Sequence, residues 1–247
     1  MHFAILPLYF MNSVLPVLTK SLKSGVDKTS GALAETAQKI SQKSQDIISY
    51  SFDFLAALAV PMVVGGVLLA YPIVFIVSTP DFLSDLNSNF FGSDIAFQIL
   101  VFALLFQFLN VLFAFILIAV DQQKKLLYIN AACVLFNLVA NYMVIPEYGF
   151  RGAAVTSVLS EMFILIANFY YARKYVNFKI NLKNLAKIIL SAALMGFAVF
   201  YLKDPTYALI QNWNVLLLVV LGALIYLALL FLTRAIDHKM LRTIIRK

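Results

Sequence analysis

Seven long apolar stretches constrain this chain more than any other feature of its sequence. They run roughly over 2–18, 51–77, 95–119, 126–145, 152–171, 188–202 and 215–232. Most of them approach the length of about 20 residues that a helix needs to cross about 30 Å of hydrocarbon. Only 13% of the residues are charged, against about 25% in soluble domains. The sequence therefore predicts an all-α, polytopic bundle of about seven transmembrane helices, forming a single transmembrane domain over 1–247.

The basic residues fall in alternate connecting segments. Of the 19 Lys and Arg residues, all but Arg151 and Lys203 lie in 19–50, 124–125, 172–187 and 234–247. Short cytoplasmic loops carry an excess of Lys and Arg. The pattern predicts a multi-pass protein of the plasma (inner) membrane, with its N-terminus outside and its C-terminus in the cytoplasm. Membrane orientation thus accounts for the net charge of +7, and we expect no nucleic-acid partner.

Two of the basic segments are predicted to be amphipathic. Within the cytoplasmic loop 19–50, the apolar residues of 31–48 fall roughly on one helical face. The basic tail 234–247 shows a similar separation of apolar and basic residues. Such helices lie at a membrane surface. They serve either as simple interfacial anchors or as binding surfaces for anionic lipid or a lipid-linked diphosphate, and the sequence leaves both interpretations open.

Glu161 is the carboxylate predicted nearest the middle of a membrane span, where a charge costs roughly 2.5–3.5 kcal/mol on insertion scales. Ser157, Glu161 and Asn168 share one face of the predicted helix, because their spacings of four and seven residues match its turns. That face is expected to point into the bundle or into a hydrated cavity. Glu161 then contacts a substrate or a cation, carries a proton, or makes a structural hydrogen bond to a neighbouring helix.

Asparagines line a second face, in the preceding span. Asn130, Asn137 and Asn141 are separated by seven and four residues. Gln107 and Asn110 form a weaker pair in the third apolar stretch. Amide side chains crosslink helices in lipid at about 0.6 kcal/mol each, and packing is the commoner explanation for such residues. The alternative is that they bind substrate.

The motifs that carry enzyme chemistry are missing from the sequence. His occurs only at positions 2 and 238, and Cys133 is the single cysteine. The sequence has no glycine-rich phosphate loop, no metal-binding His pair on a helix and no nucleophile elbow. We therefore predict no catalytic residue, no metal, no cofactor and no enzymatic activity. Asp53, at one end of the second span, is expected to cap a helix or pair with a loop lysine.

The segment from Asn137 to Glu161 resembles a hallmark of the polysaccharide (O-antigen, Wzx-type) flippases. In that family an Asn-rich helix ends at an Ile-Pro and a Tyr-Gly turn, matched here by Pro146 and Gly149. A Gly-Ala-Ala helix that ends in Ser-Glu follows, matched here from Gly152 to Glu161. We expect Pro146 to stop the first helix and Gly149 to permit the reversal. Gly152 is then expected to let the second helix pack closely.

Three further features are similar to this family, which belongs to the multidrug/oligosaccharidyl-lipid/polysaccharide (MATE-like) superfamily. They are 15–19 (Leu-Pro-Val-Leu-Thr), the helix with Pro61 and Gly65-Gly66 that follows the long charged loop, and the basic tail 234–247. Family members have twelve to fourteen helices in two lobes around a central cavity. The resemblance implies that this chain is a C-terminal lobe without its first helix, and that an N-terminal lobe lies outside the sequence.

The resemblance also implies a function. It suggests a transporter that flips an undecaprenyl-diphosphate-linked oligosaccharide from the cytoplasmic to the outer leaflet by alternating access, in polysaccharide biosynthesis. Membrane lipid and the lipid-linked oligosaccharide would be its partners. The alternatives are a cation-coupled multidrug exporter of the same superfamily, a membrane-embedded glycosyltransferase or a structural membrane subunit. The residues expected to line the cavity are Asn130, Asn137, Asn141, Ser157, Glu161, Asn168, Gln107 and Asn110.

Overall fold

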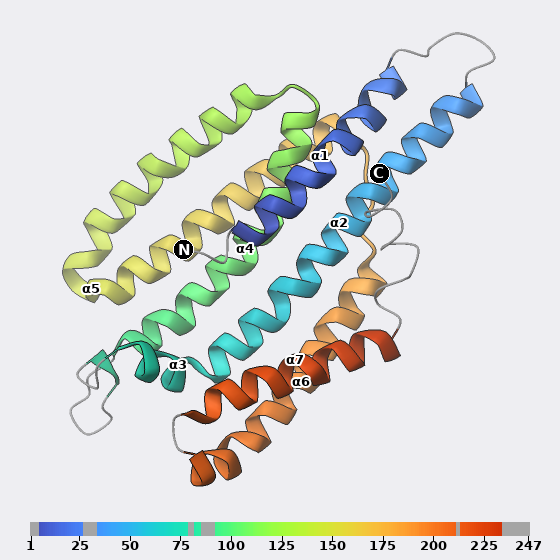
Figure 1. The fold of residues 1–247 in the computed structure, drawn as a ribbon. Helices are drawn as coiled ribbons and strands as arrows, with labels where there is room; N and C mark the ends of the chain where they lie inside the picture. The colour runs from blue at the N-terminus through green and yellow to red at the C-terminus, as the bar shows by residue number, and fades with distance from the viewer. Residues whose placement is uncertain (1–4, 27–33, 79–81, 85–91, 211–212, 234–247) are drawn as a thin grey trace.

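The described part of the chain is built from helices that cross the molecule and antiparallel turns that join them (Figure 1). The computed structural model describes residues 5–26, 34–78, 82–84, 92–210 and 213–233. Over these residues the helices are α1 (Ile5–Val26), α2 (Ala34–Leu68), α3 (Ala70–Val77), α4 (Ser93–Ala119), α5 (Gln123–Tyr175), α6 (Leu182–Ile210) and α7 (Asn214–Leu232). The prediction of an all-α fold is confirmed.

Six of these helices are long and apolar enough to cross a membrane, and α5 is long enough to do so twice. Its 53 residues would extend about 80 Å as one straight helix, far more than the hydrocarbon thickness of about 30 Å. Gly149 interrupts it with φ 57° and ψ −141°. Figure 1 shows that α5 reverses there, so that two antiparallel limbs lie side by side. The described helices are therefore long and apolar enough for seven crossings, with the two limbs of α5 counted separately.

The helix ends sort into two groups. In Figure 1 the end of α1, the start of α2, both ends of α5 and the start of α6 lie towards the upper right. The start of α4, the turn within α5 and the end of α6 lie towards the lower left. The described basic segments around 20, 124 and 173–187 therefore share one end of the bundle. This agrees with the predicted alternation, whereas the side of the membrane that each end faces stays a prediction.

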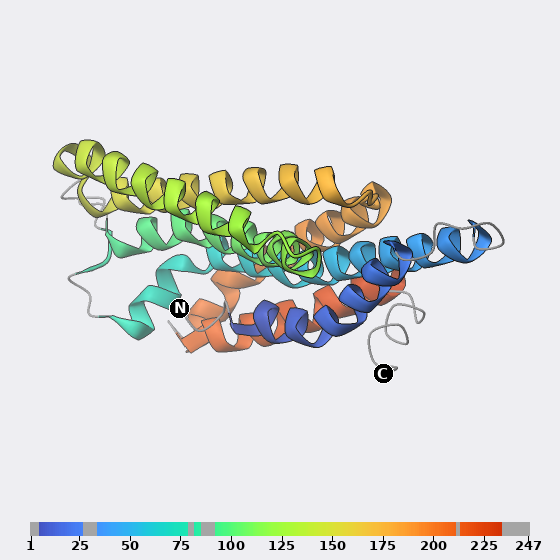
Figure 2. The same ribbon diagram turned by 90° about the horizontal axis from the view of Figure 1, so that it is seen from above.

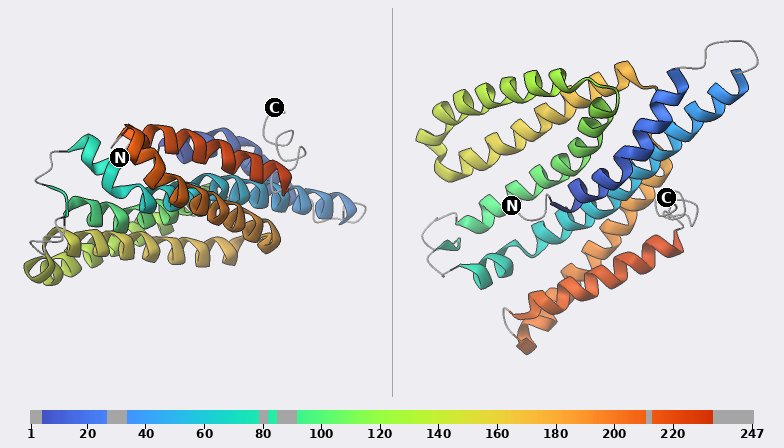
Figure 3. Two further views of the ribbon diagram at one scale, coloured as in Figure 1. Left: turned by 90° about the horizontal axis from the view of Figure 1, so that it is seen from below. Right: turned by 45° about the horizontal axis from the view of Figure 1, so that its top comes forward.

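The core lies between α2 and α4, which run through the middle of the bundle. Figure 2 shows α5 along one side of this pair and α1 and α7 along the other. On α4, Phe108, Leu112 and Ile116 repeat every four residues and are at most 1% exposed, as expected of the inward stripe of a helix. Leu55 and Ile48 of α2 are equally buried. The α5 hairpin and the α6–α7 pair occupy opposite edges (Figure 3, right).

Three boundaries differ from the sequence prediction. Residues 34–48, expected to form a separate surface helix, are the first part of α2 and continue into its membrane span. The second apolar stretch is divided into α2 and the short α3, because Leu69 has non-helical dihedral angles.

Pro146 lies inside the first limb of α5 and does not end it. Proline is tolerated in membrane helices because neighbouring groups can satisfy the carbonyl that it leaves free. The tail 234–247 lies outside the described residues.

An aromatic cluster holds the connection between α5 and α6. Phe178, in the connecting segment, stacks on Phe113 of α4 with ring centroids 5.8 Å apart. It also meets Phe169 of α5 edge-on, at 5.9 Å. Arg173 lies over the Phe169 ring at 5.8 Å. Phe178 is only 5% exposed, so the connection is packed into the core although it joins helices at opposite edges of the bundle.

Candidate functional site

A chain of hydrogen bonds joins the two limbs of α5. Asn141 donates to Asn137 at 2.8 Å, and Asn137 donates to the Ser160 hydroxyl at 2.8 Å. Thr156 donates to the Asn141 carbonyl oxygen. The pairs 137/141 and 156/160 are each one turn apart and lie opposite one another, because the limbs are antiparallel. The amides predicted to line a cavity are thus engaged with each other and with hydroxyls of the second limb.

Close approach of the limbs makes this network possible. A Cβ atom on Gly152 would lie 2.6 Å from a methyl group of Val144 and 3.1 Å from Cβ of Tyr148. A larger residue at 152 would therefore push the limbs apart near the turn. The predicted packing role of Gly152 agrees with this contact. Cys133 adds a weak bond farther along the hairpin, since its thiol lies 3.6 Å from the Ser160 carbonyl oxygen.

A second polar centre lies between α4 and the second limb of α5. Asn168 donates to the Asn110 side-chain oxygen at 2.6 Å, and Asn110 also interacts with the Glu161 carboxyl group. Asn168 is 2% exposed. Glu161 Oε2 and Asn168 Oδ1 are buried without a hydrogen-bond partner among the described residues. Two unpaired oxygens therefore flank one amide, in a region where each unpaired polar group costs several kcal/mol.

The remaining candidates do not join either centre. The Ser157 hydroxyl bonds to the Ala153 carbonyl of its own helix at 2.8 Å. Asn130 is exposed on the first limb, and Gln107 is half-buried on α4. The structure therefore brings together Asn137 with Asn141, and Asn110 with Glu161 and Asn168, and leaves the other three apart.

Thr156 and Ser160 were not among the predicted site residues, and the partner of Asp53 differs from the prediction. Thr156 and Ser160 complete the inter-limb network, and their spacing of four residues within the resemblance segment could have indicated a shared face. Asp53 was expected to cap a helix or pair with a lysine, but it accepts a hydrogen bond from Asn184 of α6 at 2.9 Å. These two residues are 131 positions apart, and no local pattern signals that contact. Asp53 is 2% exposed, and its Oδ1 has no partner among the described residues.

The groups in the second centre can act as ligands in two ways. Amide and carboxylate oxygens accept hydrogen bonds from hydroxyl groups, and they also coordinate hard cations. Within the described residues no three His, Cys, Asp or Glu side chains gather as a metal site requires. An open groove of about 480 Å³ lies elsewhere, between α2, α4 and α6, and its lining includes Val63, Val67, Phe102, Gly196 and Phe200. This groove is apolar and contains none of the candidate residues.

Comparisons with known proteins give a likeness of fold. No protein-family model matches the chain. The chain is 29% identical over 121 residues to an uncharacterized membrane protein of Methanocaldococcus jannaschii, a match that covers 48% of this chain and 23% of the other. Its structure is similar to that of the lipid II flippase MurJ in an inward closed conformation, with a TM-score of 0.65 and 17% identity, over 94% of this chain and 45% of MurJ. The chain thus spans less than half the length of the proteins that it matches.

Proposed function

We propose that this chain is one lobe of a flippase-type membrane transporter, starting from its likeness of fold to MurJ. The observation that carries the proposal is the extent of that likeness: nearly all of this chain, 94%, corresponds to 45% of the flippase. A unit of that size is what one lobe of a two-lobed transporter would provide. Binding sites in such transporters lie near the middle of the membrane, at the interface between the repeats.

The proposed substrate is an undecaprenyl-diphosphate-linked oligosaccharide. This assignment rests on the resemblance of the segment from Asn137 to Glu161 to the polysaccharide flippases. The second polar centre supports it chemically, because Glu161 and Asn168 hold buried oxygens that lack partners within the described ranges of the chain. These oxygens can accept hydrogen bonds from sugar hydroxyls. The basic end of the bundle suits a diphosphate group. The substrate would move from the cytoplasmic to the outer leaflet.

The two polar centres have different roles in this proposal. The network of Asn137, Asn141, Thr156 and Ser160 is internally paired, so we assign it to holding the α5 hairpin together. The centre of Asn110, Glu161 and Asn168 has unpaired oxygens, so we assign it to contact with substrate or a coupling cation. Neither centre is assigned to catalysis, since transport breaks no covalent bond.

Alternating access needs a second lobe. One lobe supplies only one wall of a cavity, and rocking motion requires a body to rock against. We therefore propose that an N-terminal lobe, on the same longer protein or on a separate chain, completes the transporter. Sequencing the DNA immediately upstream of the codon for Met1 is the first test. About seven further apolar segments there would support a lobe on the same longer protein or on a neighbouring gene. If the upstream DNA encodes none, the second lobe must come from a separate chain, and transport by this chain alone in the assay below would contradict the need for it.

The functional test uses a fluorescent undecaprenyl-diphosphate oligosaccharide in proteoliposomes, with a membrane-impermeant quencher outside. We expect the chain together with its N-terminal lobe to move the probe between leaflets, and the chain alone to leave it in place. Glu161→Gln should lower the rate at least tenfold, while Asn130→Ala should leave it unchanged. Equal rates for Glu161→Gln and the unsubstituted protein would remove the second centre from the proposed function.

A cation-coupled multidrug exporter is the second candidate, and the buried carboxylate of Glu161 favours it. Carboxylates inside membrane helices mark ion and proton pathways. The same proteoliposomes distinguish the two functions if they are loaded with a cationic dye and given a sodium or proton gradient. Dye export that depends on the gradient and on Glu161, without movement of the lipid probe, would favour the exporter.

A further inference from the structure

Pro61 leaves one carbonyl of α2 without its helical partner. In an α-helix the N–H of each residue bonds to the carbonyl four positions earlier. Proline has no N–H, so the carbonyl of Ala57 receives no such bond. Ala57 is 5% exposed, too deep for water to replace the missing donor. A buried carbonyl without a partner costs about 1–3 kcal/mol, so this position needs a donor from elsewhere.

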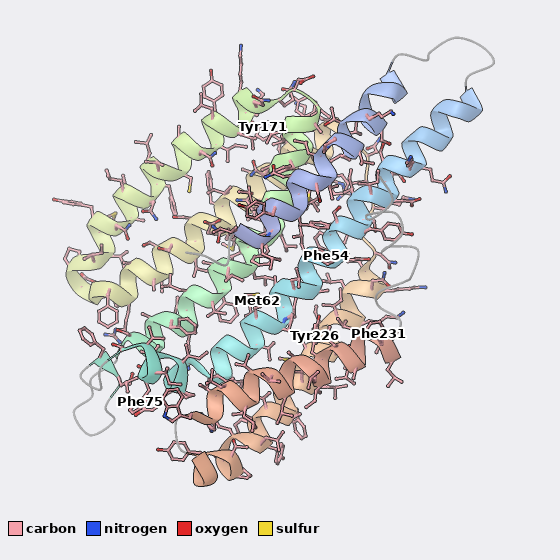
Figure 4. All side chains as sticks on the ribbon, in the orientation of Figure 1. Phe54, Met62, Phe75, Tyr171, Tyr226 and Phe231 are labelled. Atoms are coloured by element: carbon pink, nitrogen blue, oxygen red, sulfur yellow. The ribbon has the colours of Figure 1, made fainter. Side chains whose placement is uncertain are left out.

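Tyr226 of α7 supplies that donor. Its hydroxyl donates to the Ala57 carbonyl oxygen at 2.8 Å, and its side chain is 5% exposed. Figure 4 shows Tyr226 on the side of α7 that faces α2. This bond joins the two helices directly. α7 packs mainly on α6 and touches α2 only lightly, so the bond sits where few other contacts hold α7.

The helices α6 and α7 form a closely stacked pair beside α2. A Cβ atom on Gly222 of α7 would lie 3.2 Å from a methyl group of Val199 of α6. A Cβ atom on Gly196 of α6 would lie 2.6 Å from a methyl group of Val64 of α2. Asp53, four residues before Ala57 on α2, bonds to Asn184 of α6. The pair is thus held to one stripe of α2 by two polar contacts about one turn apart.

We propose that Pro61, Ala57 and Tyr226 form a latch that positions α7 against α2. Pro61 creates a free acceptor at one depth of α2, and Tyr226 can dock only at that depth. The latch is reversible, because a single hydrogen bond is weak enough to break, and Gly65 and Gly66 leave α2 readily deformable just beyond Pro61. Opening it would let α7 shift relative to α2, while α6 stays packed on α2 through Gly196 and through the bond of Asn184 to Asp53.

The latch goes beyond the proposed function. The latch can form in this chain whether or not the protein transports a substrate. Only a role for the latch in a transport cycle rests on the proposed function. Experiments on the full chain in lipid nanodiscs therefore test it directly. A failed flipping assay would leave the latch intact, and a failed latch test would leave the transporter proposal intact.

A double-mutant cycle tests whether Tyr226 serves the carbonyl that Pro61 frees. Tyr226→Phe should lower the midpoint of thermal unfolding by about 2–4 °C, the shift expected from losing one hydrogen bond in a chain of this size. In a Pro61→Ala background the helix supplies its own donor, so the same substitution should lower the midpoint by less than half as much. Tyr201→Phe, at a tyrosine that is 62% exposed on α6, is the matched control. Equal shifts in both backgrounds would overturn the pairing of Pro61 with Tyr226.

Distance measurements test the position of α7 and need no change at Pro61. Spin labels are placed on cysteines at Lys43 of α2 and Leu232 of α7, two exposed positions, after Cys133→Ala removes the single native cysteine. Tyr226→Phe should broaden the distribution of label-to-label distances, and Tyr201→Phe should not. An unchanged distribution in Tyr226→Phe would show that the bond does not position α7, and would overturn the latch.

Discussion

Single polar residues inside the bundle set the local stability of this chain, because lipid offers them no replacement partners. Asn137 is the central residue of the inter-limb network, where it donates to Ser160 and accepts from Asn141. Asn130, seven residues earlier on the same limb, is exposed. The sequence does not distinguish the two asparagines, but their surroundings predict different effects of substitution on the free energy of unfolding.

Substituting these two asparagines is the first test. Asn137→Ala should lower the free energy of unfolding by about 1 kcal/mol, since it removes two bonds worth about 0.6 kcal/mol each on average. Asn130→Ala should change it by less than about 0.5 kcal/mol, as expected of exposed positions. Unfolding in mixed detergent micelles measures both. Similar losses at the two positions would contradict the network.

Asp53 gives a second test at this scale. Asp53→Ala leaves the Asn184 amide without its acceptor and opens a cavity, so it should cost about 1–3 kcal/mol. Asp53→Asn keeps the shape and an oxygen that accepts the bond from Asn184 at its present position. It should cost less than half as much in the same unfolding assay. Equal costs would mean that the charge of Asp53, and not its hydrogen bond, stabilises α2 against α6.

At the scale of residues, local spacing carried part of the signal. The spacing of Asn137 and Asn141 predicts a shared face, and the structure uses both on that face. The contacts of Asp53 with Asn184, of Asn110 with Asn168 and of Tyr226 with Ala57 join residues 131, 58 and 169 positions apart. Such partners depend on how the helices pack, and a single sequence carries no direct record of that packing.

At the scale of elements, the turn of α5 depends on the backbone of Gly149. Its φ of 57° and ψ of −141° lie in a region that residues with a Cβ rarely adopt. A Cβ atom there would have open space around it. Any cost of a larger residue would therefore come from backbone strain and not from a clash.

Gly149→Ala should lower the free energy of unfolding by about 1–3 kcal/mol. Gly65 is the matched control, because its Cβ position is also open but it lies within the helix α2. Gly65→Ala should be neutral, or stabilising by up to about 1 kcal/mol. Thermal unfolding of the two variants in one lipid composition compares them. If both alanines behave alike, the turn does not need a left-handed residue.

Element boundaries were predictable where hydropathy changes and not where it stays constant. The sequence gives a break between 145 and 152 because Pro146, Glu147, Gly149 and Arg151 interrupt the apolar run. It gives no comparable signal at Leu69, which lies within an apolar stretch and yet separates α2 from α3. The polar segment 34–48 is amphipathic, and the same pattern suits a surface helix and the extension of a membrane helix beyond the hydrocarbon.

For the whole molecule, the charge pattern and the positions of the helix ends together predict which end of the bundle faces the cytoplasm. Cysteines introduced at Lys124 and Lys179 should react with impermeant maleimide only from the cytoplasmic side, and a cysteine at Tyr148 only from the outer side. All three positions are exposed, and Cys133→Ala supplies the background. If the cysteines at positions 124 and 148 react from the same side, the first limb of α5 does not cross the membrane.

The overall architecture was the part most open to prediction. Crossing a membrane forces helices of a certain length, and alternate basic segments fix their succession. What the pattern leaves undetermined is which helices touch, because lipid tails and leucine side chains are about equally apolar. The central place of α2 and α4, and the remote edge position of the α5 hairpin, therefore had to come from the structure.

The paired limbs of α5 have a consequence for how this protein enters its membrane during synthesis. Asn137 and Asn141 bond to each other within the first limb, but the Asn137 amide group and the Asn141 carbonyl oxygen would meet hydrocarbon unpaired if that limb left the insertion machinery alone. Thr156 and Ser160, which satisfy them, emerge only after the turn at Gly149. Insertion of both limbs together, as a preassembled helical hairpin, avoids that exposure. The second limb thus supplies the hydrogen-bond partners that the first limb needs during insertion.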